Sequence, residues 1–251
     1  MGYKVKGFHQ PFQRFASTHL LTNAIGDSPS NIYICSTNAL YKAQKEKVIR
    51  KPLVLICKMD SEKILDEIGE IYTPLSTECK QEFIASSKIN TFKKGEVVVR
   101  EKQFSKKAYL IIEGCARAYY LKDGKDISDW FTFENQFMAS IVSFFSEDPS
   151  PHYVEFVEDS VVLEFSKDTV EKLSSKHHDF ERFISKVVTE TMLGLCERLY
   201  TIQFNKAEDR YKHLLNIYPD ITQRIPLTHI ASYLGITLET LSRIRGLKNP
   251  I

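Results

Sequence analysis

The sequence contains no long hydrophobic run. A helix needs about 20 consecutive apolar residues to cross a bilayer, and a patch such as Leu53 to Cys57 has only five. The N-terminal region also lacks the apolar core followed by a small-residue cleavage site that marks a secretory signal peptide. We therefore expect a cytoplasmic protein that does not contact a membrane.

Cysteine is sparse, and histidine is missing from the middle of the chain. The five cysteines stand alone, with no C-x-x-C pair: Cys35, Cys57, Cys79, Cys115 and Cys196. An odd, dispersed set is typical of reduced thiols and not of a disulfide framework or a structural zinc site. A catalytic or redox-sensing role for one of them stays open. No histidine occurs between His19 and His152.

Charge is unevenly distributed, although the 251 residues carry a formal net charge of only +2. Residues 1–58 hold 9 Lys/Arg against 2 Asp/Glu, residues 59–204 hold 18 against 26, and residues 205–251 hold 7 against 4. A mildly basic C-terminal unit behind an acidic body suits a module that binds nucleic acid without adhering to the rest of its own chain.

The first 58 residues mix Gly, Ser, Asn and basic residues and follow neither a helical nor a strand period. The segment from Asp27 to Asn31 has the composition of a loop. We expect a basic extension that is poorly ordered or lies upstream of the true start, with ordered structure beginning near Met59. A tail that touches DNA is the alternative.

Residues 83–166 alternate short β-favouring runs with turns. Strands are expected at Glu96–Val99, Ala108–Ile112, Cys115–Leu121 and Asp129–Phe133, and two more between Tyr153 and Phe165. The dipeptide Asp123-Gly124 is a hairpin signal. So many short strands predict a compact β-roll or barrel within residues 59–180. Its core is expected to hold Tyr109, Tyr119, Trp130, Phe131, Phe133, Phe144 and Phe156.

From about Phe180 the apolar pattern becomes helical. Residues 181–204 carry a heptad-like seam with alternating steps of four and three: Val188, Met192, Leu195, Leu199 and Ile202. A helix packed on its own roll would use such a stripe, but a two-fold partner would use it better. We therefore predict a dimerisation helix.

Residues 205–251 carry the clearest pattern in the chain. Apolar residues fall at helical spacing on two short helices: Ile230, Ala231 and Leu234 on the first, Leu241 and Ile244 on the second. Gly235, between them, permits the backbone conformation of a sharp turn. This is the construction of a helix-turn-helix, whose second helix normally enters the DNA major groove. An ordinary αα-hairpin that closes a core is the alternative.

A β-roll, a long helix and a C-terminal helix-turn-helix together resemble the Crp/Fnr family of bacterial transcription regulators, over roughly residues 60–247. The stretches that carry the resemblance are Ala207 to Leu215, Ile230 to Arg245, the Lys94-Gly95 turn and Tyr109 to Gly114. Within this family, the sequence most resembles members from Bacteroidetes-type bacteria. The resemblance implies an α+β chain that binds double-stranded DNA as a homodimer and is not an enzyme. It also implies RNA polymerase as a partner.

The segment that would hold a cyclic nucleotide departs from the family. Members that bind one use a Gly-Glu pair for the ribose and a downstream Arg for the phosphate. Ala139-Ser140 and Ser150-Pro151-His152 occupy these places here, and no Arg or Lys occurs between residues 125 and 167. Burying a phosphate without a cation costs on the order of several kcal/mol. We expect a degenerate site at Ala139, Ser140, Ser150 and His152 that binds neither cyclic AMP nor cyclic GMP.

Other family features are also not indicated. Iron–sulfur members cluster their N-terminal cysteines, whereas Cys35, Cys57 and Cys79 are spaced 22 residues apart. There is no haem signature. Most members follow the second helix of the helix-turn-helix with a β-wing, but only Gly246 to Ile251 follow here. We therefore expect no cofactor and little or no wing.

The residues of the second helix that lie away from its apolar seam are the expected base readers. The resemblance matches Arg243 to a position that reads guanine and Glu239 to one that accepts from cytosine. The alternative is a surface Glu–Arg pair worth about 0.3–0.5 kcal/mol. The expected DNA contacts, with phosphate contacts at helix starts included, are Thr228, His229, Leu238, Glu239, Thr240, Ser242, Arg243 and Arg245.

The roll has two other interpretations. A cupin-like small-molecule binder with structural C-terminal helices is disfavoured as a metal enzyme, because the roll lacks the close His pair of such sites. No spacing suggests a nucleophile with its base. The roll could also be a purely structural dimer platform. An effector, if one exists, is an unidentified small molecule that shifts the long helix and so the spacing of the two DNA-reading helices.

Overall fold

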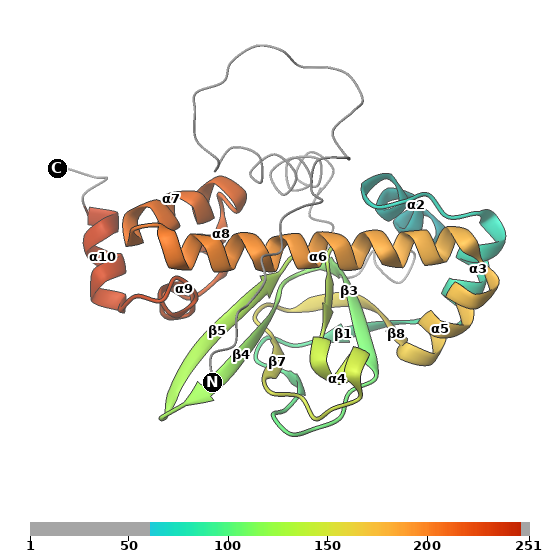
Figure 1. The fold of residues 1–251 in the computed structure, drawn as a ribbon, viewed down its shortest axis with the longest axis horizontal. Coiled ribbons are helices and arrows are strands. Elements are labelled where there is room, and N and C mark those ends of the chain that lie inside the picture. The colour runs from blue at the N-terminus through green and yellow to red at the C-terminus, as the bar shows by residue number, and fades with distance from the viewer. Residues whose placement is uncertain (1–60, 247–251) are drawn as a thin grey trace, which may run out of the picture. The chain divides into compact units, whose positions relative to one another are not determined.

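The computed structural model of the chain describes residues 61–246 (Figure 1). The expectations for residues 1–58, and for a wing beyond Gly246, fall outside the described residues. Within them, no helix is both long enough and apolar enough to cross a membrane.

Two four-stranded antiparallel sheets form the predicted roll, drawn in teal, green and yellow in Figure 1. One sheet has the order β1 (Lys88–Phe92), β8 (Ser160–Ser166), β3 (Lys107–Glu113) and β6 (Phe137–Ala139). The other has the order β2 (Val97–Val99), β7 (Tyr153–Phe156), β4 (Ala116–Lys122) and β5 (Lys125–Thr132). The α+β class with a β-roll is thus confirmed. The short edge strands β1 and β6 lie outside the expected set.

Turn chemistry fixes two corners of the roll. Asp123 and Gly124 both have positive φ, 53° and 74°, as the two-residue hairpin between β4 and β5 requires. Gly114 after β3 has φ 101°, and a Cβ there would lie 2.2 Å from Oγ of Ser160. Only glycine fits at this close approach of two chain segments.

The interior of the roll is aromatic. Phe92 stacks on Phe156 with ring centroids 4.5 Å apart, and Tyr109 meets Phe156 edge-on. Six of the seven expected core aromatics are buried, and Trp130 is partly exposed. Phe131 and Phe133 nevertheless differ from the expectation, since they pack against the C-terminal helices and not inside the roll. Phe131 lies in β5 and Phe133 directly follows its last residue; extended residues two apart share a face, and this face contacts those helices.

Helices cover one side of the first sheet. The expected helix after Met59 is α2 (Ser61–Ile71). It is joined by α3 (Thr77–Ala85), α4 (Ile141–Ser146) and α5 (Lys167–Lys176), which the sequence pattern did not predict. Serine caps begin two of them: Ser76 accepts from the backbone N–H of Cys79, and Ser166 from that of Thr169. Figure 1 shows α2, α3 and α5 near the beginning of α6.

The longest helix is α6 (His178–Phe204), and it leads into the C-terminal helices α7 (Ala207–Ile217), α8 (Ile221–Arg224), α9 (Leu227–Tyr233) and α10 (Leu238–Gly246). The turn between α9 and α10 contains Gly235 at φ 66°. The apolar residues expected to form the seam of this helix pair are all buried in one cluster: Ile230, Ala231, Leu234, Leu241 and Ile244.

Candidate functional site

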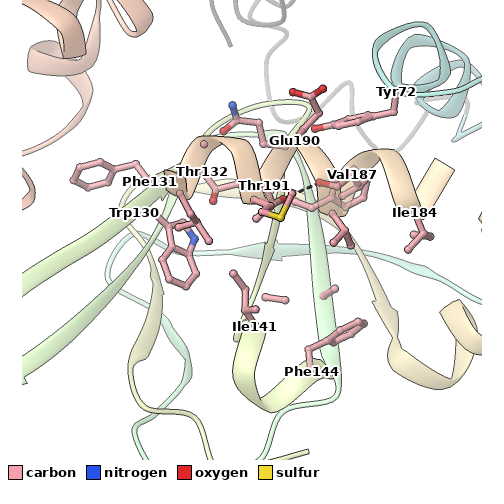
Figure 2. Close-up of a pocket in the computed structure, with 18 of the residues that line it drawn as sticks. Tyr72, Trp130, Phe131, Thr132, Ile141, Phe144, Ile184, Val187, Glu190 and Thr191 are labelled. Atoms are coloured by element: carbon pink, nitrogen blue, oxygen red, sulfur yellow. Dashed lines mark hydrogen bonds between the residues drawn. The ribbon is translucent and has the colours of Figure 1, made fainter. Parts of the chain in front are cut away.

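An apolar cavity of about 430 Å³ lies between the roll and α6. Figure 2 shows its wall along α6, with Trp130 of β5 on one side and Ile141 and Phe144 of α4 below. Strands β3, β6 and β8 contribute Ala108, Ala139 and Phe165. Its volume is within the range of small-molecule sites.

The charged groups that line the cavity are already paired. Glu190 on α6 binds Lys186 with Oε1 2.6 Å from Nζ. Arg198, also on α6, lies 3.3 Å from a carboxylate oxygen of Asp129 and stacks over the ring of Tyr233 at 4.7 Å. Their other polar atoms, Oε2 of Glu190 and Nε of Arg198, are buried and have no hydrogen-bond partner among the described residues.

In the segment expected to be a degenerate nucleotide site, the polar groups hydrogen-bond to one another. Oγ of Ser140 donates to Oγ of Ser150 at 2.8 Å, and Oγ of Ser150 donates to the carbonyl of His152 at 2.7 Å. All three residues are buried, whereas Ala139 is half-buried in β6. Serine hydroxyls that satisfy one another give no positive charge for a phosphate.

His152 is a buried histidine without hydrogen bonds at either ring nitrogen within the described residues. Its ring meets those of Trp130 and Tyr120 edge-on, with centroids 4.9 and 5.6 Å apart. Burial lowers its pKa, and the nearby carboxylate of Asp129 only partly opposes this. The roll therefore holds His152 in its neutral form at neutral pH.

The predicted dimerisation seam lies on an open face of α6. Val188, Met192, Leu195 and Leu199 are exposed, with Met192 and Leu199 at 55% and 56%, and Ile202 is half-buried. Four large apolar side chains in one row are an unusual surface for a monomer. Three of them, Val188, Met192 and Leu195, also line the mouth of the cavity.

The expected base readers lie together on α10. Leu238, Glu239, Ser242, Arg243 and Arg245 are exposed, and Thr240 is half-buried. Thr237 caps the helix by accepting from the backbone N–H of Thr240 at 3.2 Å. Within residues 61–246 no ion pair joins Glu239 to Arg243, and the two arginines have no carboxylate partner.

The two expected phosphate contacts on α9 are placed differently from each other. Thr228 is exposed, whereas His229 faces the roll, with Nδ1 3.0 Å from Nη1 of Arg117. Burial, followed by the charge of Arg117, lowers the pKa of His229. The backbone N–H of Ser128 in β5 also donates to Oγ of Ser232 in α9, at 2.8 Å. Helix α9, the first helix of the α9–α10 pair, therefore packs against the roll.

Two arginines whose side chains are at most 8% exposed, and which the sequence patterns did not indicate, join the roll to the C-terminal helices. Arg117 on β4 is 2% exposed and binds Glu155 and Asp126 at 2.6 Å. Arg224 at the end of α8 binds Glu134 at 2.7 and 2.9 Å and Glu158 at 2.7 Å. Although burial alone lowers an arginine pKa, these carboxylates raise the pKa of both residues. The signal for Arg117 was its place within the otherwise uncharged strand Ala116 to Leu121.

Two overlapping groups in the described range have metal-ligand chemistry: Cys79 with His177 and Asp179, and Glu78 with Glu82 and His177. Single ligand atoms of Cys79, His177 and Asp179 lie within 4.8 Å of one another. Asp179 already accepts from the backbone N–H of Ser76 at 2.6 Å, and His177 lies 3.3 Å from Glu82. Burial raises the pKa of the Cys79 thiol to about 12, so the thiol stays protonated. These contacts join α3 to the start of α6, and we assign them a structural role.

The architecture is similar to that of several known proteins. Residues 89–177 match the family described as cyclic nucleotide-binding domain. FixK2 from Bradyrhizobium japonicum shares 19% identity, with a TM-score of 0.56 over 64% of this chain and 83% of that protein. The c-di-GMP responsive global regulator CLP of Xanthomonas campestris shares 16%, with a TM-score of 0.55 over 69% and 92%.

A Crp/Fnr family transcriptional regulator from Eubacterium rectale shares 17% identity, with a TM-score of 0.55 over 69% of this chain and 84% of that one. No curated protein sequence matches the chain. At these identities the likeness is one of fold. Residues 89–177 thus correspond to a cyclic nucleotide-binding domain, and the described chain has the fold of Crp/Fnr-type transcription regulators.

Proposed function

We propose that this chain is a sequence-specific DNA-binding transcription regulator that acts as a homodimer and reads the major groove with α10. The observation that carries the proposal is the exposed face of α10, where Arg243 and Arg245 have no carboxylate partner within the described residues. A solvent-facing guanidinium fork can bond O6 and N7 of guanine together. Glu239, one turn earlier on the same helix, can accept from cytosine.

The rest of the expected DNA interface follows from this placement. Leu238, Thr240 and Ser242 border the two arginines on α10, and Thr228 is exposed at the start of α9. His229 would reach a phosphate only after leaving Arg117. Contact with RNA polymerase stays a prediction from the family resemblance.

The dimer is proposed from the apolar row on α6. Two copies of α6 packed along Val188, Met192, Leu195 and Leu199 would cover side chains that now face solvent. Helix-turn-helix dimers bind half-sites about one DNA turn apart, so a parallel pair of long helices is a suitable spacer for two copies of α10.

The sensor part of the proposal is that cyclic AMP and cyclic GMP are not effectors. The closed serine pair Ser140–Ser150 and the neutral His152 replace the groups that hold ribose and phosphate. Arg117, the buried cation of the neighbouring sheet, is bound by two carboxylates. No described cation is therefore available for a phosphate inside the roll.

Selection of bound duplexes from a random DNA pool tests the proposal. The full chain is used with and without cyclic AMP, and Arg243→Ala is the matched control. We expect a two-fold-related site to be enriched equally in both conditions, and enrichment to weaken at one base position in the variant. Enrichment that needs cyclic AMP would contradict the sensor part, and no enrichment would contradict DNA reading.

A further inference from the structure

Three side chains with metal-ligand chemistry meet where α3 lies beside the junction of α5 and α6 (Figure 1). They are the thiol of Cys79 in the first turn of α3, the imidazole of His177 at the junction, and the carboxylate of Asp179 at the start of α6. One ligand atom of each lies within 4.8 Å of those of the other two. The ligand atoms of a tetrahedral zinc site lie about 3.4–3.6 Å apart, so shifts of about 1 Å at the side-chain ends bring these three into range.

His177 carries a buried polar atom without a hydrogen bond. Its side chain is 9% exposed, and Nε2 has no hydrogen-bond partner among the described residues, although Oε2 of Glu82 lies 3.3 Å away. A buried polar group that is left unsatisfied destabilises a fold. A metal ion at one ring nitrogen, with Glu82 accepting from the other, would satisfy the ring, and zinc-bound histidines commonly have such a carboxylate partner.

The electrostatic surroundings of Cys79 favour a cation. Burial first, and then the negative charges of Asp179, Glu82 and Glu78, raise the pKa of its thiol to about 12. Those same negative charges attract a divalent ion. When such an ion binds, the S–H bond of Cys79 breaks, the sulfur ligates as a thiolate, and the proton leaves to solvent. The thiolate and one carboxylate then balance the double charge of Zn²⁺, so the buried site carries no net charge.

The carboxylate of Asp179 is already oriented. Its Oδ2 accepts from the backbone N–H of Ser76 at 2.6 Å, and its Oδ1 accepts from that of Phe180 at 3.0 Å. A carboxylate has about four lone-pair positions, so each oxygen keeps capacity for a metal ion. Hydrogen bonds of this kind fix the ligands of natural metal sites, and here they hold Asp179 against α3 without using up its oxygens.

Sulfur and nitrogen donors beside a carboxylate suit Zn²⁺, whereas Mg²⁺ and Ca²⁺ take oxygen ligands. We propose that Cys79, His177 and Asp179 form a structural zinc site that clamps α3 to the start of α6. The ligands come from segments far apart in the chain, so the sequence spacing that predicted no cofactor could not reveal it. The site lies apart from the residues that carry the proposed function, and neither proposal depends on the other.

Cobalt(II) is the first probe, because it enters zinc sites and its absorption spectrum reports the ligands. The full chain is reduced, freed of metal with a chelator and titrated with Co²⁺. We expect one equivalent to give a thiolate-to-cobalt charge-transfer band and the intense d–d bands of a four-coordinate site. Zn²⁺ should remove both, and excess Mg²⁺ should not. A spectrum without the charge-transfer band would overturn the site.

Cys79→Ser tests the sulfur ligand. We expect it to abolish the charge-transfer band and to weaken Zn²⁺ binding at least about 100-fold, measured by competition with a chromogenic chelator. Cys196→Ser, which changes an exposed cysteine, is the matched control and should keep both the band and the affinity. The joint variant Cys35→Ser with Cys57→Ser should also keep them. A band that persists in Cys79→Ser would place the metal at another thiol and overturn the site.

His177→Asn tests the nitrogen ligand and keeps the proposal falsifiable if Cys79→Ser does not fold. It retains a polar side chain at the junction of α5 and α6 but removes the imidazole. We expect Zn²⁺ to bind at least about tenfold more weakly. An unchanged dissociation constant would show that His177 is not a ligand and would overturn the site.

The overlapping group of Glu78, Glu82 and His177 is the competing position for an ion. Its two carboxylates are paired with Lys176, so they are less available than Asp179. Glu78→Gln is therefore expected to leave the Zn²⁺ affinity unchanged. Glu82→Gln, which replaces the partner of the His177 ring, is expected to weaken it about tenfold. A loss in Glu78→Gln as large as that expected for the thiol variant would place the ion at this second group and overturn the proposal.

Urea unfolding tests the clamp between α3 and α6. An ion that binds the folded chain and not the unfolded one stabilises the fold. Saturating Zn²⁺ is therefore expected to raise the urea midpoint of the parent chain and to leave that of Cys79→Ser nearly unchanged. The metal-free midpoint of the variant shows whether it folds. An equal rise in the two chains would mean that Zn²⁺ stabilises the protein from elsewhere, and would overturn the clamp.

Discussion

Arginines at the junction between the roll and the C-terminal helices differ in their contacts from the arginines of α10. Arg117 and Arg224 are buried between carboxylates of the roll, and each has at least two acidic partners. Arg243 and Arg245 on α10 are exposed and have no acidic partner within the described residues. A buried, saturated guanidinium fixes structure, whereas an exposed one can bind a new anion. Of these four arginines, the two that are free to bind a phosphate therefore lie on α10, the proposed DNA-reading helix.

The largest effect is expected when the arginine that joins the roll to α8 is removed. Arg224→Ala leaves Glu134 and Glu158 facing each other without their cation, and breaking a buried pair of this kind costs about 3–5 kcal/mol. Urea unfolding of the full chain measures the change. Lys212→Ala is the control, since its pair with Glu208 is half exposed and worth less than about 1 kcal/mol. Equal losses in the two variants would remove the distinction between buried and exposed cations.

The next largest effect concerns the apolar row on α6, which in the proposed dimer sets the distance between two copies of α10. Met192→Asp places a carboxylate in the centre of the proposed interface, where its desolvation is expected to weaken the dimer by more than 100-fold, about 2.7 kcal/mol. Light scattering reports the oligomeric state. Lys186→Ala, which changes an exposed residue on the same helix, is expected to leave it unchanged. A dimer that survives Met192→Asp would place the interface elsewhere.

Arg243→Ala tests whether an exposed arginine of α10 contacts a DNA base. Loss of a bidentate contact to guanine is expected to cost about 1–3 kcal/mol in specific binding and to relax the preference at one base position. Lys248→Ala, at a position beyond the expected base readers, should change affinity at all sequences alike. Unchanged base preference in Arg243→Ala would show that this arginine reads no base.

The sequence predicted the parts of the fold that local chemistry determines. The Asp123-Gly124 hairpin needs two positive φ angles, and the two short C-terminal helices need Gly235 and an apolar seam, so each is visible in a few adjacent residues. Helices α4 and α5 were missed because short helices carry weak periodicity and gain their stability from tertiary packing.

The contacts of the candidate sites depend on distant parts of the chain. Arg224 meets Glu134 across 90 positions, and His229 meets Arg117 across 112. No sequence spacing connects such residues, so the seating of α9 on the roll was not predictable. The expected base readers were easier to locate, because a helical period alone separates exposed from buried residues on α10.

The smallest effect is expected at His152. It tests whether the roll can hold a protonated imidazole that has no acidic partner. Burial keeps the folded-state pKa of His152 below its unfolded value of about 6.5, so the unfolded chain binds more protons as the pH falls. The stabilising effect is nearly complete above pH 6.5 and is lost below it, by up to about 1.4 kcal/mol at pH 5.5. His152→Phe keeps the edge-on ring contacts, so its urea midpoint should fall less between pH 7.5 and 5.5 than that of the parent chain. His178→Phe, at an exposed position, should behave like the parent. If His152→Phe lost as much stability on acidification as the parent, the roll would accommodate a charged imidazole, and the contrast with α10 would not extend to histidine.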